Sequence, residues 1–116
     1  MAFRLYCVDD ESIFRDFEDV DVTLGRRFAT DMYIGLGTTI PDMGLVSRRH
    51  VRIYYDLNGD LGSGHYLEGL GRNGTSVDSK IVDEGEYRRL NEGSVIRFGG
   101  LGVVVPPAFW FSERGE

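Results

Sequence analysis

Glycine is the feature of this sequence that most limits its fold. Sixteen of the 116 residues are glycine, and they divide the chain into short runs rich in β-branched and aromatic residues. No segment has apolar residues recurring every 3.6 positions over several turns, which is the pattern of an amphipathic helix. Many short strands joined by glycine-rich turns are typical of a β-sandwich or barrel, so the sequence predicts an all-β fold.

Seven runs have the length and composition of strands and are bounded by turn residues. They are residues 3–8, 20–24, 51–55, 65–69, 75–77, 94–99 and 101–105. Asn58-Gly59 lies between two of these runs and predicts a hairpin with a tight turn. Residues 28–45 are the least strand-like part, with only residues 33–36 as a candidate strand, so we expect a long and partly irregular connection there.

The length of the chain fits one domain with a single core. We expect residues 1–116 to form this domain, with its core from about residue 3 to about residue 105. Residues 106–116 then form a C-terminal tail, because it begins with two prolines that cannot continue a ladder of hydrogen bonds. The three aromatic residues of this tail, 109–111, offer surface that can fold back onto the body.

The charge of the chain is −6 and is unevenly distributed. Residues 9–21 hold seven acidic residues and one arginine, whereas the rest of the chain is neutral. The acidic stretch is interpreted as a solvated loop and strand face. Without a basic surplus, direct nucleic-acid binding is not expected. No apolar run approaches the roughly 20 residues that span a bilayer, and no signal peptide is evident, so we expect an intracellular domain, nuclear or cytoplasmic, without membrane contact.

Metals, cofactors and catalysis are not expected. One cysteine and two histidines are too few for a zinc site, and Cys7 is interpreted as a small buried hydrophobic residue. Asp56, Asn58 and Asp60 have the spacing of a calcium loop, but leucines replace its glycine and its bidentate glutamate. Ser47 and His50 lack a nucleophile-elbow pattern and a third orienting group, so no enzyme is predicted.

The stretch GLGRNG has the glycine spacing of a dinucleotide-binding loop, at Gly69, Gly71 and Gly74. Such a loop must open a helix whose N-terminus faces the pyrophosphate. Here TSVDSKIV follows, which is β-branched and rich in turn residues and has no helical period. The sequence therefore does not support a nucleotide cofactor.

Four short motifs occur in an order that resembles the forkhead-associated (FHA) domain. Gly25-Arg26 comes first, the run SRRH at residues 47–50 second, the run GRNGT at residues 71–75 third, and a closing segment LNEGSVIRFGG at residues 90–100 last. The similarity extends from about residue 3 to about residue 105. The resemblance implies a β-sandwich of two mainly antiparallel twisted sheets, about eleven strands in all, with loops at one end that bind phosphothreonine peptides.

The resemblance also implies roles for individual residues. Arg26 would reach the phosphate or the peptide backbone, Ser47 would donate its hydroxyl to a phosphate oxygen, and Arg48 would supply charge. Asn73 would hydrogen-bond the peptide main chain. Arg72 stands where the family often has a serine or threonine that contacts phosphate.

Four further residues would support the site rather than touch the ligand. His50 would support the binding loop from inside, Gly74 and Thr75 would shape the turn that presents Asn73, and Gly25 belongs to the first motif. Strand alternation would put Arg48 on the wrong face if a strand began at residue 47, so we expect regular pleating to begin only at about His50. The 21-residue step from Arg26 to Ser47 is longer than usual in the family and predicts a loop that bulges beside the peptide groove.

Elementary chemistry agrees with these assignments. A phosphothreonine carries about −1.5 to −2 charges and three acceptor oxygens, which guanidinium, hydroxyl and carboxamide donors match. The predicted function is a phosphothreonine-peptide-binding interaction module in phosphorylation-dependent signalling, whose partner is a threonine-phosphorylated protein or peptide. The resemblance leaves open whether the chain is a fragment of a kinase or a DNA-damage-response protein. The alternative is a phosphate-independent structural or homodimerisation domain of the same fold, and the roles of Arg27, Arg49 and Arg52 also stay open.

Overall fold

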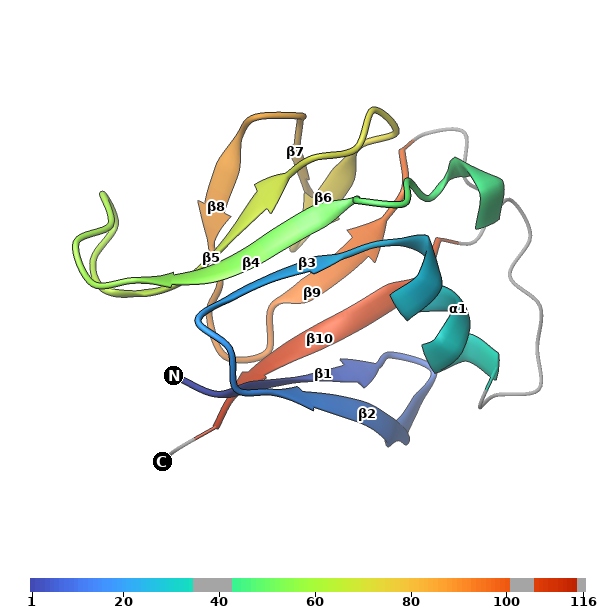
Figure 1. Ribbon diagram of the computed structural model, residues 1–116, viewed down its shortest axis with the longest axis horizontal. Helices are drawn as coiled ribbons and strands as arrows, with labels where there is room; N and C mark the ends of the chain where they lie inside the picture. Colours follow the sequence, from blue (N-terminus) through green and yellow to red (C-terminus); the bar gives the residue numbers. More distant parts are fainter. Residues whose placement is uncertain (35–42, 101–105, 115–116) are drawn as a thin grey trace.

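The computed structural model describes residues 1–34, 43–100 and 106–114, which form ten strands, one α-helix and one short 3₁₀ helix (Figure 1). In chain order they are β1 (Phe3–Cys7), β2 (Asp10–Phe17), β3 (Asp21–Leu24), α1 (Arg26–Ile34), η1 (Met43–Leu45), β4 (Val51–Asp56), β5 (Gly64–Gly69), β6 (Thr75–Val77), β7 (Lys80–Val82), β8 (Tyr87–Arg89), β9 (Val95–Phe98) and β10 (Ala108–Glu113).

The strands form two sheets that pack face to face. One sheet has the order β2-β1-β10-β9-β6-β7 and the other the order β3-β4-β5-β8. Every paired neighbour within the two sheets is antiparallel. The predicted all-β sandwich of two antiparallel sheets is therefore confirmed, with ten strands in the described residues where about eleven were expected.

The core lies between the two sheets and is built by strand alternation. In β1, Phe3, Leu5 and Cys7 are fully buried, while the residues between them are only partly so. Cys7 is a free buried thiol, in agreement with the sequence interpretation. Side chains from both sheets meet these residues, including Ile53 and Ile96. Burial of such aliphatic and aromatic side chains, each contributing about 1.5–3 kcal/mol, is what holds the layers together.

The expectation of a C-terminal tail at 106–116 is wrong, because Ala108–Glu113 form β10 between β1 and β9 in the middle of the larger sheet. The two prolines do not interrupt the ladder since they precede the strand, and Pro107 contributes only its carbonyl, which accepts the N–H of Phe98 at 2.9 Å. Phe109 and Phe111 are fully buried. Trp110 points to the other face, where its ring stacks on Tyr6 at a centroid distance of 4.0 Å.

The expected connection over residues 28–45 begins with regular structure that the sequence did not predict, because Arg26–Ile34 is the helix α1. The candidate strand at 33–36 is wrong at its first two residues, which belong to α1; residues 35 and 36, like the candidate strand at 101–105, lie outside the described residues. Phe28, Ala29, Met32 and Tyr33 are buried and anchor the helix on the core. Nine residues make only two and a half turns, so the apolar spacing repeats once and gives no sustained period.

The hydroxyl of Tyr33 joins α1 to the start of β10. It donates to the carbonyl of Ala108 at 3.2 Å and accepts the N–H of the same residue at 3.0 Å. Burial raises the pKa of this phenol, which therefore stays neutral and keeps both bonds across the physiological range. The helix is thus fixed to the sheet by a polar contact as well as by apolar packing.

The remaining strands and turns refine the sequence predictions. β7 and β8 are three-residue strands that the sequence did not indicate, and the acidic stretch contains β2, an edge strand with mostly exposed side chains. The β4–β5 hairpin is confirmed, but its connection spans residues 57–63 and is not a two-residue turn. No helix in the described part of the chain is long and apolar enough to cross a bilayer.

Replacing Phe109 by alanine tests the role of β10 in the core. Its ring contacts Phe28 and Phe98 at centroid distances of 4.9 and 5.3 Å, so Phe109→Ala should lower the free energy of unfolding by about 3–5 kcal/mol. Phe14→Ala, on edge strand β2 and 44% exposed, is the matched control and should cost less than about 1 kcal/mol. Equal losses in urea denaturation would contradict a central position of β10.

Candidate functional site

Three connections that are far apart in the sequence meet at one end of the sandwich (Figure 1). They are the β3–α1 junction, the segment 43–50 before β4, and residues 70–74 between β5 and β6. Backbone hydrogen bonds join them in pairs: the N–H of Arg26 donates to the carbonyl of Ser47 at 2.9 Å, and the N–H groups of Leu70 and Gly71 donate to the carbonyl of His50 at 2.9 and 3.1 Å. The three motifs therefore share one surface.

The imidazole of His50 links two of these connections. Its Nδ1 accepts the N–H of Ser47 at 3.0 Å, so the proton of a neutral ring lies on Nε2, which donates to the carbonyl of Gly74 at 2.7 Å. The side chain is fully buried and stacks on Phe98 at 5.2 Å. Burial lowers the pKa of His50, and the bond to Gly74, which favours the charged ring, opposes this only in part.

Two glycines allow the connections to approach this closely. A Cβ on Gly25 would lie 1.9 Å from the carbonyl oxygen of Arg48, and a Cβ on Gly71 would lie 2.6 Å from Oγ of Ser47. At Gly25 the obstacle is backbone, so this position accepts only glycine with this backbone. At Gly71 a Cβ would displace the side chain of Ser47. Gly71 thus places the loop between β5 and β6 directly against Ser47.

Arg26 is held by the segment that precedes β4. Its Nε donates to the carbonyl of Val46 at 2.9 Å and its Nη2 donates to the carbonyl of Gly44 at 3.3 Å. A guanidinium has five N–H donors, so these bonds fix its orientation and leave donors available for a ligand. The side chain is half-buried at the first residue of α1.

An open pocket of about 430 Å³ lies beside Arg26. Arg27, Thr30, Asp31 and Arg48 complete its lining. Neither Arg26 nor Arg48 has an ion-pair partner among the residues that the structure describes. The pocket therefore contains guanidinium groups that form no ion pair, and Asp31 is the one acidic residue in its lining.

Arg52 does not belong to this group. Its guanidinium binds Asp21 at 2.7 Å and Glu68 at 3.1 Å on the face of the smaller sheet. These bonds raise the pKa of Arg52 and lower that of Asp21. The sequence left the roles of Arg27, Arg49 and Arg52 open. The structure answers this question for Arg52, which belongs to an ion-pair cluster on the surface.

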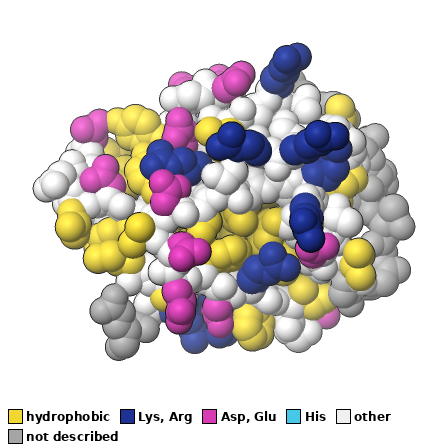
Figure 2. All heavy atoms as spheres, viewed as in Figure 1, with side chains coloured by type: hydrophobic (Ala, Val, Ile, Leu, Met, Phe, Trp, Pro, Cys, Tyr) yellow, Lys and Arg dark blue, Asp and Glu magenta, His cyan; other side chains and the backbone are white. Residues whose placement is uncertain are grey.

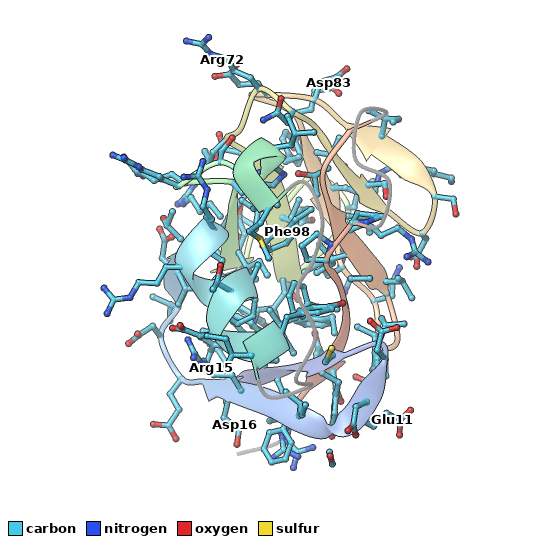
Figure 3. All side chains as sticks on the ribbon, turned by 90° about the vertical axis from the view of Figure 1, so that its right-hand side faces the viewer. Glu11, Arg15, Asp16, Arg72, Asp83 and Phe98 are labelled. Atoms are coloured by element: carbon cyan, nitrogen blue, oxygen red, sulfur yellow. The ribbon has the colours of Figure 1, made fainter. Side chains whose placement is uncertain are left out.

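The loop between β5 and β6 presents Arg72 and Asn73 differently. Arg72 is exposed at the tip and extends away from the body (Figure 3), so the structure does not bring it against Arg26. Asn73 is half-buried, and its backbone lies against Gly100, where a Cβ would be 2.2 Å from the carbonyl of Asn73. Gly74 has a φ of 78°, and Thr75 is buried at the start of β6.

All nine residues singled out in the sequence lie on the three converging connections or at their ends. Ser47 to His50 precede β4, which begins at Val51, so the expected start of pleating at about residue 50 is confirmed. The sequence did not identify Gly71 and Phe98 as supports of the site, nor Thr30 as part of the pocket. Gly71 was visible within GLGRNG, whereas Phe98 and Thr30 carry no local signal.

Basic side chains gather towards this end of the molecule. On the face shown in Figure 2, lysine and arginine predominate in the upper right part, while acidic residues lie mainly to the left and below. A chain with a net charge of −6 thus carries a locally basic surface near the converging connections. No group of three or more residues suited to hold a metal ion occurs in the described part of the chain.

The sandwich and its converging connections define an FHA domain, and the chain belongs to this family: the FHA domain model matches residues 22–99. A similar sequence is the fork head protein homolog 2 of Schizosaccharomyces pombe, 35% identical over 60 residues, which cover 52% of this chain and only 9% of that protein.

Two solved structures show the same fold. The N-terminal FHA domain of Rad53p from Saccharomyces cerevisiae, in complex with a phosphothreonine peptide, has a TM-score of 0.71 at 20% identity and is covered to 94%, against 98% of this chain. A second FHA domain, from a study of phosphothreonine-dependent FHA interactions, has a TM-score of 0.65 at 23% identity, with both chains fully covered.

The buried imidazole predicts a pH dependence of stability. The pKa of His50 is lowered in the folded state, so its contribution is complete above the unfolded value of about 6.5 and is lost as the pH falls below it, because the unfolded chain then binds a proton that the native ring resists. Urea denaturation at pH 7.5, 6.5 and 5.5 should show this loss. His50→Gln should be less stable at pH 7.5 and show a smaller decline; an identical slope would refute the assignment.

Proposed function

We propose that this FHA domain binds phosphothreonine peptides and has no catalytic activity of its own. The observation that carries the proposal is the convergence of Arg26, Ser47 and Asn73, on three distant segments, around one end of the sandwich. The solved structure of Rad53p, which has this fold, holds a phosphothreonine peptide, and this supports the same ligand class for the present chain.

Each group has a defined task in this proposal. The free donors of the Arg26 guanidinium and the exposed guanidinium of Arg48 attract the phosphate and share its negative charge. The hydroxyl of Ser47 donates to a phosphate oxygen. The carboxamide of Asn73, which has no hydrogen-bond partner among the described residues, pairs with the main chain of the peptide. Arg72, at the loop tip, contacts acidic groups that flank the phosphothreonine.

His50 prepares the site without touching the ligand. It fixes the N–H of Ser47 and the carbonyl of Gly74 at once, so the hydroxyl donor and the Asn73 turn keep their separation before the peptide arrives. A site held in this way loses little conformational entropy on binding, which favours affinity for a small ligand group. The partner is accordingly a threonine-phosphorylated protein or peptide, in an intracellular signalling context.

The test is binding with and without the phosphate. A phosphothreonine peptide selected from an oriented library should bind at least about 100-fold more tightly than its unphosphorylated form in calorimetric titration. Ser47→Ala should weaken the phosphopeptide about 10-fold or more, because a hydrogen bond to a charged group contributes about 1.5–3 kcal/mol. Asn73→Ala should weaken it about 2- to 10-fold, because a hydrogen bond to the uncharged peptide main chain contributes about 0.5–1.5 kcal/mol. Arg26→Ala should weaken it further, since it also removes the bonds that hold Val46 and Gly44.

Arg114→Ala is the matched control, because it removes one exposed positive charge from the last described residue of the chain, beyond β10. It should leave phosphopeptide affinity within about twofold. Equal affinity for the phosphorylated and unphosphorylated peptides would contradict the proposal and favour a phosphate-independent interaction domain or a homodimerisation domain. Analytical ultracentrifugation would then distinguish these two alternatives by the oligomeric state of the domain.

A further inference from the structure

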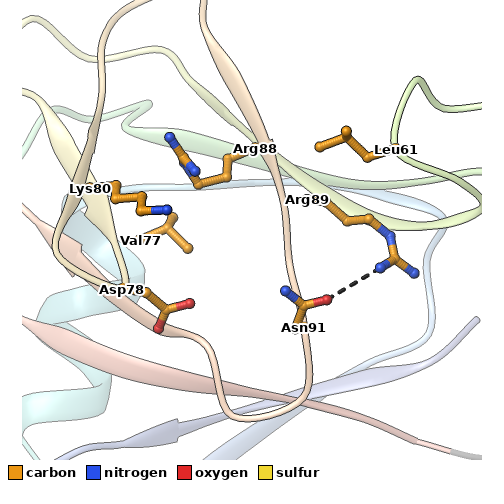
Figure 4. Close-up of a pocket in the computed structure, with 7 residues that line it drawn as sticks. All are labelled: Leu61, Val77, Asp78, Lys80, Arg88, Arg89 and Asn91. Carbon is orange, nitrogen blue, oxygen red and sulfur yellow. Dashed lines mark hydrogen bonds between the residues drawn. The ribbon is translucent and has the colours of Figure 1, made fainter.

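A second pocket lies between the edge strands of the two sheets, away from the converging connections. β7 ends the larger sheet and β8 ends the smaller one, and a pocket of about 300 Å³ lies where these edges face each other (Figure 4). Its wall includes Val77, Asp78, Lys80, Arg88, Arg89 and Asn91. None of these residues belongs to the candidate phosphothreonine site, so the two sites share no side chain.

Three cations and one carboxylate line this pocket, which gives it a net charge of +2. In the described part of the chain, Lys80, Arg88 and Arg89 take part in no ion pair, whereas Arg4, Arg15 and Arg52 each contact a carboxylate. The one acid, Asp78, is already engaged, because its Oδ1 accepts the N–H of Val95 at 2.9 Å. Clustered like charges repel one another, so this arrangement is unfavourable without an anion.

The two arginines also have donors that no protein atom satisfies. Nε of Arg88 and Nε of Arg89 are the buried side-chain nitrogens without a hydrogen-bond partner among the described residues. The other nitrogens of Arg89 do have partners, since Nη1 donates to Asn91 at 3.2 Å and Nη2 donates to the carbonyl of Ser63 at 2.9 Å. A buried donor left unpaired costs about 1–3 kcal/mol, more when it is charged, so the protein alone does not satisfy either guanidinium fully.

The fold places these side chains at the pocket. Arg88 is paired with Leu67 across β5 and β8, and cross-strand partners point to the same face; because Leu67 is fully buried, Arg88 points between the sheets at their open edge. Lys80 enters from the other sheet after a sharp turn in which Asp78 and Ser79 both have positive φ, 51° and 69°. Figure 4 shows Lys80 and Arg88 directed towards the same part of the pocket.

We propose that this edge pocket is a second anion site, which binds a phosphate monoester on a phosphorylated residue of a partner protein. The net charge of +2 matches the −1.5 to −2 of a phosphate monoester better than the single charge of a carboxylate. The phosphate oxygens accept from the Lys80 ammonium and from the terminal N–H groups of Arg88, which Figure 4 shows directed towards the same part of the pocket, and Arg89 adds its charge from the neighbouring position on β8. The proposal does not rest on the phosphothreonine site, and it gives the domain a second contact for a multiply phosphorylated partner.

Nuclear magnetic resonance of the arginine Nε–H groups tests the site directly. Inorganic phosphate, N-acetylphosphoserine amide and acetate are titrated separately into the domain at constant ionic strength. The Arg88 and Arg89 Nε–H signals should shift saturably with phosphate. The affinity derived from these shifts should be at least about 10-fold higher for phosphate than for acetate, and higher for phosphoserine than for inorganic phosphate.

Variants separate this site from the first. Lys80→Gln, on an exposed side chain, should weaken phosphate at least about threefold, and Arg88→Gln should abolish the saturable shift of Arg89. Arg114→Gln is the charge-matched control and should leave the affinity unchanged. Ser47→Ala, which removes a proposed phosphothreonine contact, should also leave the shifts at Arg88 and Arg89 intact, so failure of one site is distinguishable from failure of the other.

Three results would overturn the proposal. Shifts that rise linearly with all three anions would show that nothing binds at the pocket. Acetate binding as tightly as phosphate would contradict the assignment of a phosphate monoester. If phosphoserine binds no more tightly than inorganic phosphate, the proposal that the ligand is a phosphorylated residue of a partner protein is contradicted. Because Lys80→Gln changes an exposed residue, its effect can be measured even if Arg88→Gln does not fold.

Discussion

The structure of the candidate site depends on one neutral imidazole. His50 accepts from the backbone of Ser47 and donates to the backbone of Gly74 while its ring stacks on Phe98, so one side chain fixes the spacing between two loops and ties both to the core. Neither bond can be made by an aliphatic residue of similar size, and a protonated ring would lose the bond from Ser47. The buried ring of His50 therefore maintains the spacing between the segment that carries Ser47 and the turn that carries Asn73.

The arginines of this acidic domain fall into two groups. Arg4 and Arg52 contact carboxylates of neighbouring strands and Arg15 contacts Asp31 of α1, and such surface pairs contribute little to stability. Arg26 and Arg48 at the loops, and Arg88 and Arg89 at the sheet edges, have no carboxylate partner in the described part of the chain. The overall charge of the domain therefore does not describe the local charge at these two places, where the arginines lack a carboxylate partner.

Much of the fold and the location of the site could be predicted from the sequence, because short β-branched runs and ordered motifs are local signals. The elements that the sequence did not predict depend on contacts between residues that are far apart in the chain. The α1 helix is too short to show a period and is held by Tyr33 on Ala108, 75 residues away. β10 follows two prolines that indicate a tail, yet it pairs with β1 and β9 at the centre of a sheet. The edge pocket was invisible because Lys80 and Arg88 are brought together only when the sheets stack.

The pairing of β1 with β10 places the two ends of the domain close together. Phe3 lies opposite Glu113 in the register, so the chain enters and leaves the fold at neighbouring points, at the pole remote from α1 and η1 (Figure 1). A polypeptide joined at either terminus would approach from the side of the domain opposite the three converging connections. Further polypeptide can therefore be attached at both ends of the domain without covering the three converging connections.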